Sequence, residues 1–275
     1  MPVAAPDAEI LEELEYLVAQ TDNARTIANL KGWPAIVRTL SAPTDDVATA
    51  GAWAVGSAVK LDAVVQDNAL DAAVMPALIK LLHAGSSEGS AAARRSASTR
   101  TKAVFALGHL LRSNRRAQRL FATHKGPELL LAELRPSTGG AEEQQHQPAI
   151  GLTKKILALV ADLLEDPVSL PSMVAGLHTV EWCASIAAAA AGGLGPEPLG
   201  GKRQAAELAV KTMLTQHSVA QSAECTSAFF AEDRAAVWQA WHATWEKEAQ
   251  QPGEDGEYPE QLAELMTQLM KLHPK

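Results

Sequence analysis

The stretch GWPAIVRTL, residues 32–40, decides the fold because its pattern occurs three times in the chain. VMPALIKLL begins at Val74 and KGPELLLAEL begins at Lys125. In each stretch, apolar residues recur at the spacing of an amphipathic helix. A proline lies where the first helical turn has no hydrogen bond to lose, and these prolines are Pro34, Pro76 and Pro127. The three stretches therefore predict three related helix starts.

A second apolar helix is predicted after each of these. These second helices begin near Asp45, Thr99 and Leu152, and a fourth begins near Lys202 after an apolar segment from Val180. Two sets of positions align by eye: Trp53, Phe105 and Ala158, and Gly56, Gly108 and Ala161. The small residues of the second set indicate close helix packing. The units recur roughly every 50 residues, which is typical of armadillo or HEAT repeats lengthened by loops.

The predicted fold is an all-α, right-handed α-solenoid of about four armadillo-like repeats, each built on a helix pair. We expect one domain over 1–275, with repeats at 31–62, 74–112, 125–166 and 177–216, and capping helices at 8–20 and 233–272. Three polar or glycine-rich stretches are predicted to be flexible loops: Ala84–Ser98, Arg135–Pro148 and Gly192–Gly201.

Composition agrees with helices and excludes several classes of protein. Of the 275 residues, 47% are hydrophobic but only 4% are aromatic. The formal net charge of −8 disfavours binding to nucleic acid. No apolar run reaches the roughly 20 residues of a membrane span, and no secretory or retention signal is visible. Cys183 and Cys225 are free to pair or to stay reduced, and they predict neither a disulfide scaffold nor a metal site.

Motifs for catalysis are weak. GSSEG at Gly85–Gly89 matches a nucleophile elbow around Ser87, but no strand precedes it. GLG at 193–195 does not complete a phosphate-binding loop, and the histidines lack metal-ligand spacing. We therefore expect that the protein is not an enzyme and that it binds neither a cofactor nor a metal ion.

Three other features have a structural and a functional interpretation. The stripe formed by Trp238, Trp241 and Trp245 is either core or an exposed anchor for a partner. The cluster RRAQR at 115–119 is interpreted as the polar face of a helix. His109 on a repeat helix either lines a binding surface or is merely solvated.

Four ordered segments resemble the armadillo-type nucleotide exchange factors of Hsp70 chaperones, the Fes, Sil and Hsp70-binding-protein family. These segments are LEYLVAQTDNARTIANLKGWPAIVRTL (14–40), AGAWAVGSAVKLD (50–62), RTKAVFALGHLLR (100–112) and RRAQRLFATHKGPELL (115–130). The resemblance extends from Leu11 to Pro167. VEWCASI from Val180 and the C-terminal residues 253–272 look like the endoplasmic-reticulum, Sil-type branch, which acts on the lumenal Hsp70 called BiP.

The resemblance implies that a concave surface clasps one lobe of the Hsp70 ATPase domain and promotes ADP release, as a monomer in a 1:1 complex. It implies the endoplasmic-reticulum lumen, with the cytoplasm as the alternative compartment. The implied partner-binding residues are Asp22, Asn23, Ala24, Arg100, Lys102, His109 and Lys154. Asp22 and Asn23 also suit helix capping, and Lys154 also suits a solvated face.

Two other interpretations stay open. The first is a protein-binding adaptor unrelated to Hsp70, of which the import-receptor type uses a W-x-x-x-N ladder. Here the corresponding pairs lack asparagine: Trp53 and Ser57, Phe105 and His109, Ala158 and Asp162. The second is a hydrolase built on Ser87.

Overall fold

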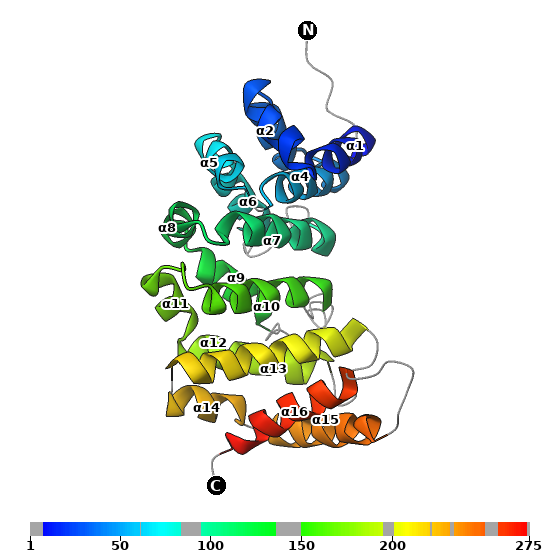
Figure 1. Ribbon diagram of the computed structural model, residues 1–275, viewed down its shortest axis with the longest axis vertical. Helices are drawn as coiled ribbons and strands as arrows, with labels where there is room; N and C mark the ends of the chain where they lie inside the picture. Colours follow the sequence, from blue (N-terminus) through cyan, green and yellow to red (C-terminus); the bar gives the residue numbers. More distant parts are fainter. Residues whose placement is uncertain are drawn as a thin grey trace. The chain divides into compact units, whose positions relative to one another are not determined.

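Every regular element in the described part of the chain is a helix (Figure 1). The computed structural model describes residues 8–60, 62–83, 95–135, 150–194, 201–220, 222–231, 234–250 and 258–273. The predicted flexible loops lie mostly outside these ranges. In the described ranges no single helix is long and apolar enough to cross a membrane, and a pair bent by 53°, Pro171–Leu177 with Val180–Ala191, reaches that length and composition only when taken together.

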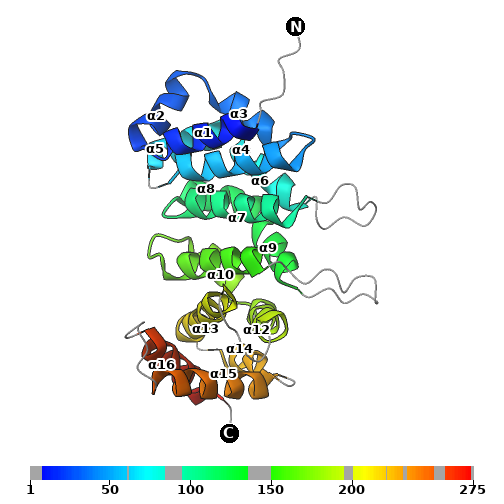
Figure 2. The same ribbon diagram turned by 90° about the vertical axis from the view of Figure 1, so that its right-hand side faces the viewer.

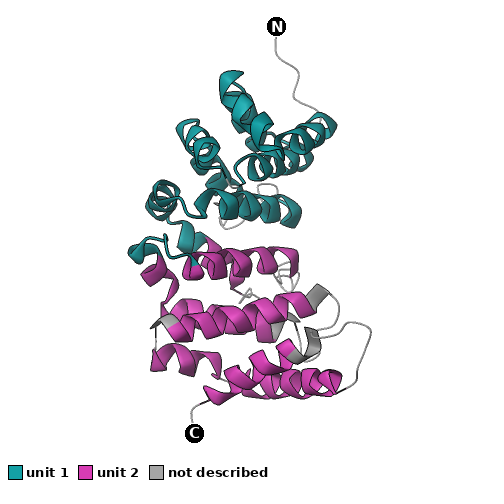
Figure 3. Ribbon diagram, viewed as in Figure 1, with its two compact units in different colours: residues 1–129, 166–173 teal, residues 130–165, 174–275 magenta. Residues whose placement is uncertain are grey.

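The helices group into two compact units (Figure 3). Unit 1 comprises residues 1–129 and 166–173, and unit 2 comprises residues 130–165 and 174–275. The single domain expected over 1–275 stays a prediction.

Unit 1 is built from parallel rows of stacked helices. Its complete helices are α1 (Ala8–Val18), α2 (Thr21–Asn29), α3 (Trp33–Leu40), α4 (Asp45–Ala58), α5 (Ala63–Asp71), α6 (Val74–His83), α7 (Ala97–Leu111) and α8 (Arg115–Thr123). Helices α1, α4 and α7 lie side by side in one row (Figure 2), while α2 packs on α5 and α3 packs on α6. The helices predicted from Pro34 and Pro76 are confirmed as α3 and α6, and the second helices predicted after them are confirmed as α4 and α7.

Each repeat contains a third helix that the pairing prediction missed. Helices α2, α5 and α8 each have nine residues. They bury only two to four side chains each and, unlike α3, have no proline in the first turn to mark their start. Two of them begin at side-chain caps: Asp62 accepts from the amides of Val64 and Val65, and Asn114 accepts from that of Ala117. The repeat is therefore a helix triplet.

Side chains about one repeat apart bond to each other across unit 1. The hydroxyls of Thr49 and Thr99 lie 2.8 Å apart, and Arg95 pairs with Asp45 at 3.0 Å. Buried polar groups need such partners. These bonds fix the register between neighbouring repeats.

Gly56 permits the close contact of α4 with α7. A Cβ atom there would lie 2.5 Å from the Phe105 ring and 3.1 Å from the Ala106 Cα. The prediction of close packing at this small-residue position is confirmed.

Unit 2 repeats the same side-by-side stacking. Its helices are α9 (Gly126–Leu134), α10 (Ile150–Glu165), α11 (Pro171–Leu177), α12 (Val180–Leu194), α13 (Gly201–Ala220), α14 (Ala223–Phe229), α15 (Arg234–Ala249) and α16 (Tyr258–Lys271). Helices α9 and α11 each begin in unit 1. Helix α13 packs on α10, α12 and α16, and α15 packs on α16.

The core of unit 2 contains the predicted tryptophan stripe. Trp238, Trp241 and Trp245 are at most 1% exposed, and the Trp238 indole N–H donates to the Phe229 carbonyl at 2.8 Å. The core interpretation is therefore confirmed and the exposed-anchor interpretation is wrong. Cys183 and Cys225 are joined in a disulfide between α12 and α14.

Candidate functional site

Four partly exposed side chains form a continuous strip on α4 and α7, which we call the α4–α7 strip: Trp53, Lys102, Phe105 and His109. The Lys102 ammonium lies 3.5 Å from the centre of the Trp53 ring and 5.9 Å from that of Phe105. The His109 ring meets Phe105 nearly edge-on, with ring centres 4.6 Å apart. A cation over an aromatic face is attracted by the quadrupole of the ring. Partly exposed aromatic side chains of this kind are enriched at protein interfaces.

Helical spacing brings the strip together. Lys102, Phe105 and His109 stand at i, i+3 and i+7, so they share one face of α7. Trp53 joins them from α4 because the two helices pack directly, with Gly56 against the Phe105 ring.

A hollow of about 210 Å³ adjoins the strip at His109. Its lining residues are Ala63, Gln66, His109, Arg112 and Ser113. Gln66 is 5% exposed and bonds in three directions: its Nε2 donates to the carbonyls of Val59 (3.3 Å) and His109 (2.9 Å), and its Oε1 accepts from Asn114 Nδ2 at 3.0 Å. The floor of the hollow is therefore rigid.

The carboxylates nearest to this region are occupied by structural bonds. Amide hydrogen bonds from Val65, then the bond and charge of Arg25, lower the pKa of Asp62. Burial raises the pKa of Asp166, but hydrogen bonds from Val168 and Ser113 and the charge of Arg112 outweigh it, so this pKa is also lowered. Both groups are thus ionised: Asp62 caps α5, and Asp166 accepts from the backbone amides of Ser113 and Val168. The arrangement is suited to binding a protein surface.

The structure places some of the predicted contact residues at the surface and others in the core. Lys102 and His109 lie in the strip. Arg100 is 6% exposed and Ala24 is 2% exposed, so neither offers a surface to a partner, and both assignments need correction. Arg100 precedes Lys102 by two residues, which turns it to the opposite, inner face of α7. Ala24 is a core residue of α2, so an Ala24→Arg variant would test the fold instead of the contact.

Asp22 and Asn23 are exposed in the first turn of α2. The residue at the cap position is Gln20, so the capping interpretation of this pair is wrong. The Asn23 side-chain amide instead donates to the Leu17 carbonyl at 2.9 Å, which fastens α2 to the end of α1.

Lys154 belongs to unit 2 and lies on α10. Its ammonium donates to the Gln204 side chain on α13. It is partly exposed, and its role as a contact stays a prediction.

The sequence aligned Trp53 with Phe105 without selecting either as a contact residue. The signal available in the sequence was a bulky aromatic residue at the same position of two repeats, with Lys102 one helical turn before Phe105. An import-receptor ladder would require asparagine at position 57. The chain has Ser57 there, and its hydroxyl donates a hydrogen bond to the Glu15 carboxylate.

The remaining motifs have no catalytic context in the described ranges. Ser87 and its GSSEG segment lie outside them. Gly193 lies inside α12 and no strand leads into it. Among the described residues, no group of three or more His, Cys, Asp or Glu side chains is arranged to hold a metal ion.

Comparison with solved structures defines the class of protein. A designed armadillo repeat protein superposes with a TM-score of 0.63 at 12% identity, covering 99% of this chain and 95% of that chain. Together with the helix triplets, this makes the chain an all-α, armadillo-like solenoid. Residues 23–172 match the family described as the SIL1/FES1/HPBP1 C-terminal domain. The chain belongs to this family.

Two curated relatives have the same name, Hsp70 nucleotide exchange factor FES1. The protein from Mycosarcoma maydis is 34% identical over 170 residues, which is 62% of this chain and 38% of that protein. The protein from Eremothecium gossypii is 28% identical over 165 residues, 58% of this chain and 54% of that protein. The similarity thus spans about half or less of the relatives' length. The family prediction is confirmed, but the closer resemblance to the Sil-type branch is not.

Proposed function

We propose that this chain is an adenyl-nucleotide exchange factor that binds the ATPase domain of an Hsp70 chaperone, one chain to one domain, and promotes ADP release. The family match over residues 23–172 carries the proposal. The shared name of the two relatives supports it.

The mechanism follows from linkage between two ligands of one protein. A factor that binds the open form of the ATPase domain more tightly than the closed form raises the population of the open form. The nucleotide and the exchange factor must then each weaken the binding of the other, and the ratio of affinities is the same in both directions. A 100-fold effect requires about 2.7 kcal/mol of differential contact. No side chain of the factor needs to touch the nucleotide.

We propose the α4–α7 strip as part of the docking surface, with Asp22, Asn23 and Lys154 as further candidate contacts. Partly exposed aromatic side chains supply contact area, and Lys102 supplies a positive charge that Trp53 holds in place. Desolvation of this cation against a carboxylate of the partner would make its charge important for affinity.

Two observations bear on which Hsp70 is the partner. The two relatives are named as FES1 exchange factors of Hsp70 and neither name mentions BiP, which leaves a cytosolic Hsp70 as the alternative partner. The buried Cys183–Cys225 disulfide favours an oxidising compartment, where BiP would be the partner. A comparison of BiP with a cytosolic Hsp70 decides between them.

Lys102→Glu is expected to weaken binding to the ATPase domain at least tenfold, because the reversed charge repels the carboxylate that Lys102 would face. Binding is measured by calorimetry with the nucleotide-free domain. Lys80→Glu is the matched control: Lys80 is exposed on α6, in another row of unit 1, and its reversal should leave affinity unchanged. A folded Lys102→Glu protein with wild-type affinity would exclude the strip as the contact.

A further inference from the structure

Helix α8 has three arginines on its outward face, which we call the α8 arginine face: Arg115, Arg116 and Arg119. All three are exposed, whereas the buried residues of the helix, Ala117, Gln118 and Phe121, lie on the opposite side. Arg119 lies at the centre of the outward face, with the other two arginines one helical turn before it.

The stretch of sequence that contains this face is basic, whereas the whole chain is acidic. The chain has a formal net charge of −8. Between Arg95 and Pro127, however, the sequence contains no Asp or Glu. The Lys and Arg residues of this stretch are Arg95, Arg100, Lys102, Arg112, Arg115, Arg116, Arg119 and Lys125. Folding concentrates three of them on one exposed helix face of unit 1.

Two of the arginines are held in place by neighbours in unit 1. Arg115 donates its Nε–H to the Val168 carbonyl at 2.9 Å. Arg116 pairs with Asp71 and, at 3.6 Å, with Asp67 on α5. The guanidinium group of Arg119 makes no hydrogen bond or ion pair with any residue that the structure describes, although the Arg119 carbonyl accepts from the Thr123 hydroxyl at 2.9 Å. Side chains fixed before binding lose less entropy when a ligand arrives, and Arg119 is available to accept a new partner.

We propose that the α8 arginine face binds an acidic linear segment of a partner protein. Guanidinium groups match carboxylates in two-point hydrogen bonds, and Arg115 and Arg119 are spaced one helical turn apart, within reach of one short peptide. Asp67 and Asp71 offset the charge of Arg116, so Arg115 and Arg119 are the guanidinium groups left for a ligand. Two such groups fit a short acidic segment better than a long polyphosphate. This surface is separate from the α4–α7 strip, and the proposal does not rest on the exchange function.

The test uses the full chain without any Hsp70. A fluorescent peptide containing six consecutive glutamates is titrated with the protein at low and physiological salt, and anisotropy is recorded. We expect saturable binding that weakens as salt rises. Arg119→Ala should weaken it about threefold and Arg119→Glu about tenfold, in line with one exposed charge interaction lost or reversed.

Arg38→Glu is the matched control, because Arg38 is exposed near the end of α3, in a different row of unit 1. It should bind the peptide as the wild type does. Circular dichroism confirms that each variant is folded. Equal binding by all variants, or no peptide binding at low salt, overturns the proposal. Binding of anionic vesicles or single-stranded DNA with no binding of the peptide also overturns it, in favour of another class of partner.

Discussion

Reduction of the Cys183–Cys225 disulfide is expected to lower the free energy of unfolding of unit 2 by about 4 kcal/mol. The two cysteines are 42 residues apart in sequence and their Cα atoms lie 5.4 Å apart. The cross-link therefore closes a long loop, and its removal restores to the unfolded chain the conformational freedom that the bond had excluded. Both cysteines are fully buried, so the bond also contributes to the packing of α12 against α14.

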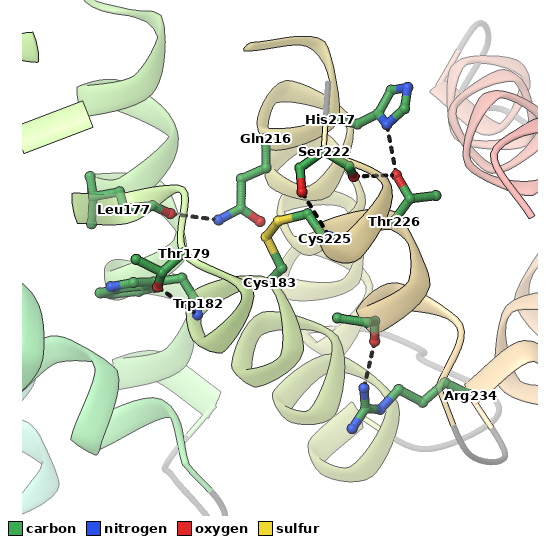
Figure 4. The surroundings of a disulfide bond; sticks show 11 residues. Leu177, Thr179, Trp182, Cys183, Gln216, His217, Ser222, Cys225, Thr226 and Arg234 are labelled. Carbon is green, nitrogen blue, oxygen red and sulfur yellow. Dashed lines mark hydrogen bonds between the residues drawn. A yellow bond between two sulfur atoms is a disulfide. The ribbon is translucent and has the colours of Figure 1, made fainter. Parts of the chain in front are cut away.

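The surroundings show what the bond fixes (Figure 4). Gln216 of α13 donates to the Leu177 carbonyl at 2.9 Å, and Ser222 caps α14 by accepting from the Cys225 amide at 3.2 Å. At the start of α12, the Thr179 hydroxyl accepts from the Trp182 amide at 3.4 Å. The disulfide thus joins two helices whose first turns are held by hydrogen bonds. We expect reduction to loosen α14 first, because it has only seven residues.

Urea unfolding with and without reductant measures this effect. Tryptophan fluorescence is a suitable probe, because Trp182, Trp238, Trp241 and Trp245 are all buried in unit 2. The double variant Cys183→Ala/Cys225→Ala is the control, and reductant should not shift its midpoint. The same midpoint for oxidised and reduced wild type would show that the cross-link contributes no stability.

Gln66→Leu is expected to destabilise unit 1 by about 3 kcal/mol, because it leaves buried polar groups without partners. Leucine fills a similar volume but cannot bond to the carbonyls of Val59 and His109 or to the Asn114 amide. The His109 carbonyl belongs to the same residue that ends the α4–α7 strip. The variant should therefore also weaken binding to the ATPase domain.

Urea unfolding followed by circular dichroism measures the loss of stability. Gln20→Leu is the matched control: Gln20 is exposed before α2 and makes no capping bond with its side chain, so its change should be smaller than 0.5 kcal/mol. Equal effects of the two substitutions would contradict the structural role of the Gln66 bonds.

The proline-led helices and the longer helices that follow them could be predicted from sequence, whereas α2, α5 and α8 could not. First-turn prolines such as Pro34 and Pro127 indicated helix starts because their local geometry has few alternatives. Helices α5 and α8 have no such proline, and part of the face that each buries is polar, at Gln66 and Gln118. Their signal was instead a cap residue followed four positions later by glutamine, Asp62 with Gln66 and Asn114 with Gln118. These polar residues matter because they bond to neighbouring repeats, which local propensity does not describe.

The candidate site was predictable only in part. Arg100 and Lys102 are both basic residues of one helix, and the sequence alone did not tell which would be buried. Ala24 was selected because a small residue permits close approach, but it is buried in the core of unit 1 and 2% exposed. Pairing of Cys183 with Cys225 depends on how α12 and α14 pack, which neither spacing nor composition determines.

Release of fluorescent ADP from the ATPase domain, followed by stopped flow with and without this protein, tests the central claim most directly. BiP and a cytosolic Hsp70 are compared under identical conditions. We predict that release from one of them accelerates about 100-fold at saturating protein and that Lys102→Glu raises the concentration required. An unchanged release rate for both chaperones, with the protein folded, would contradict the account.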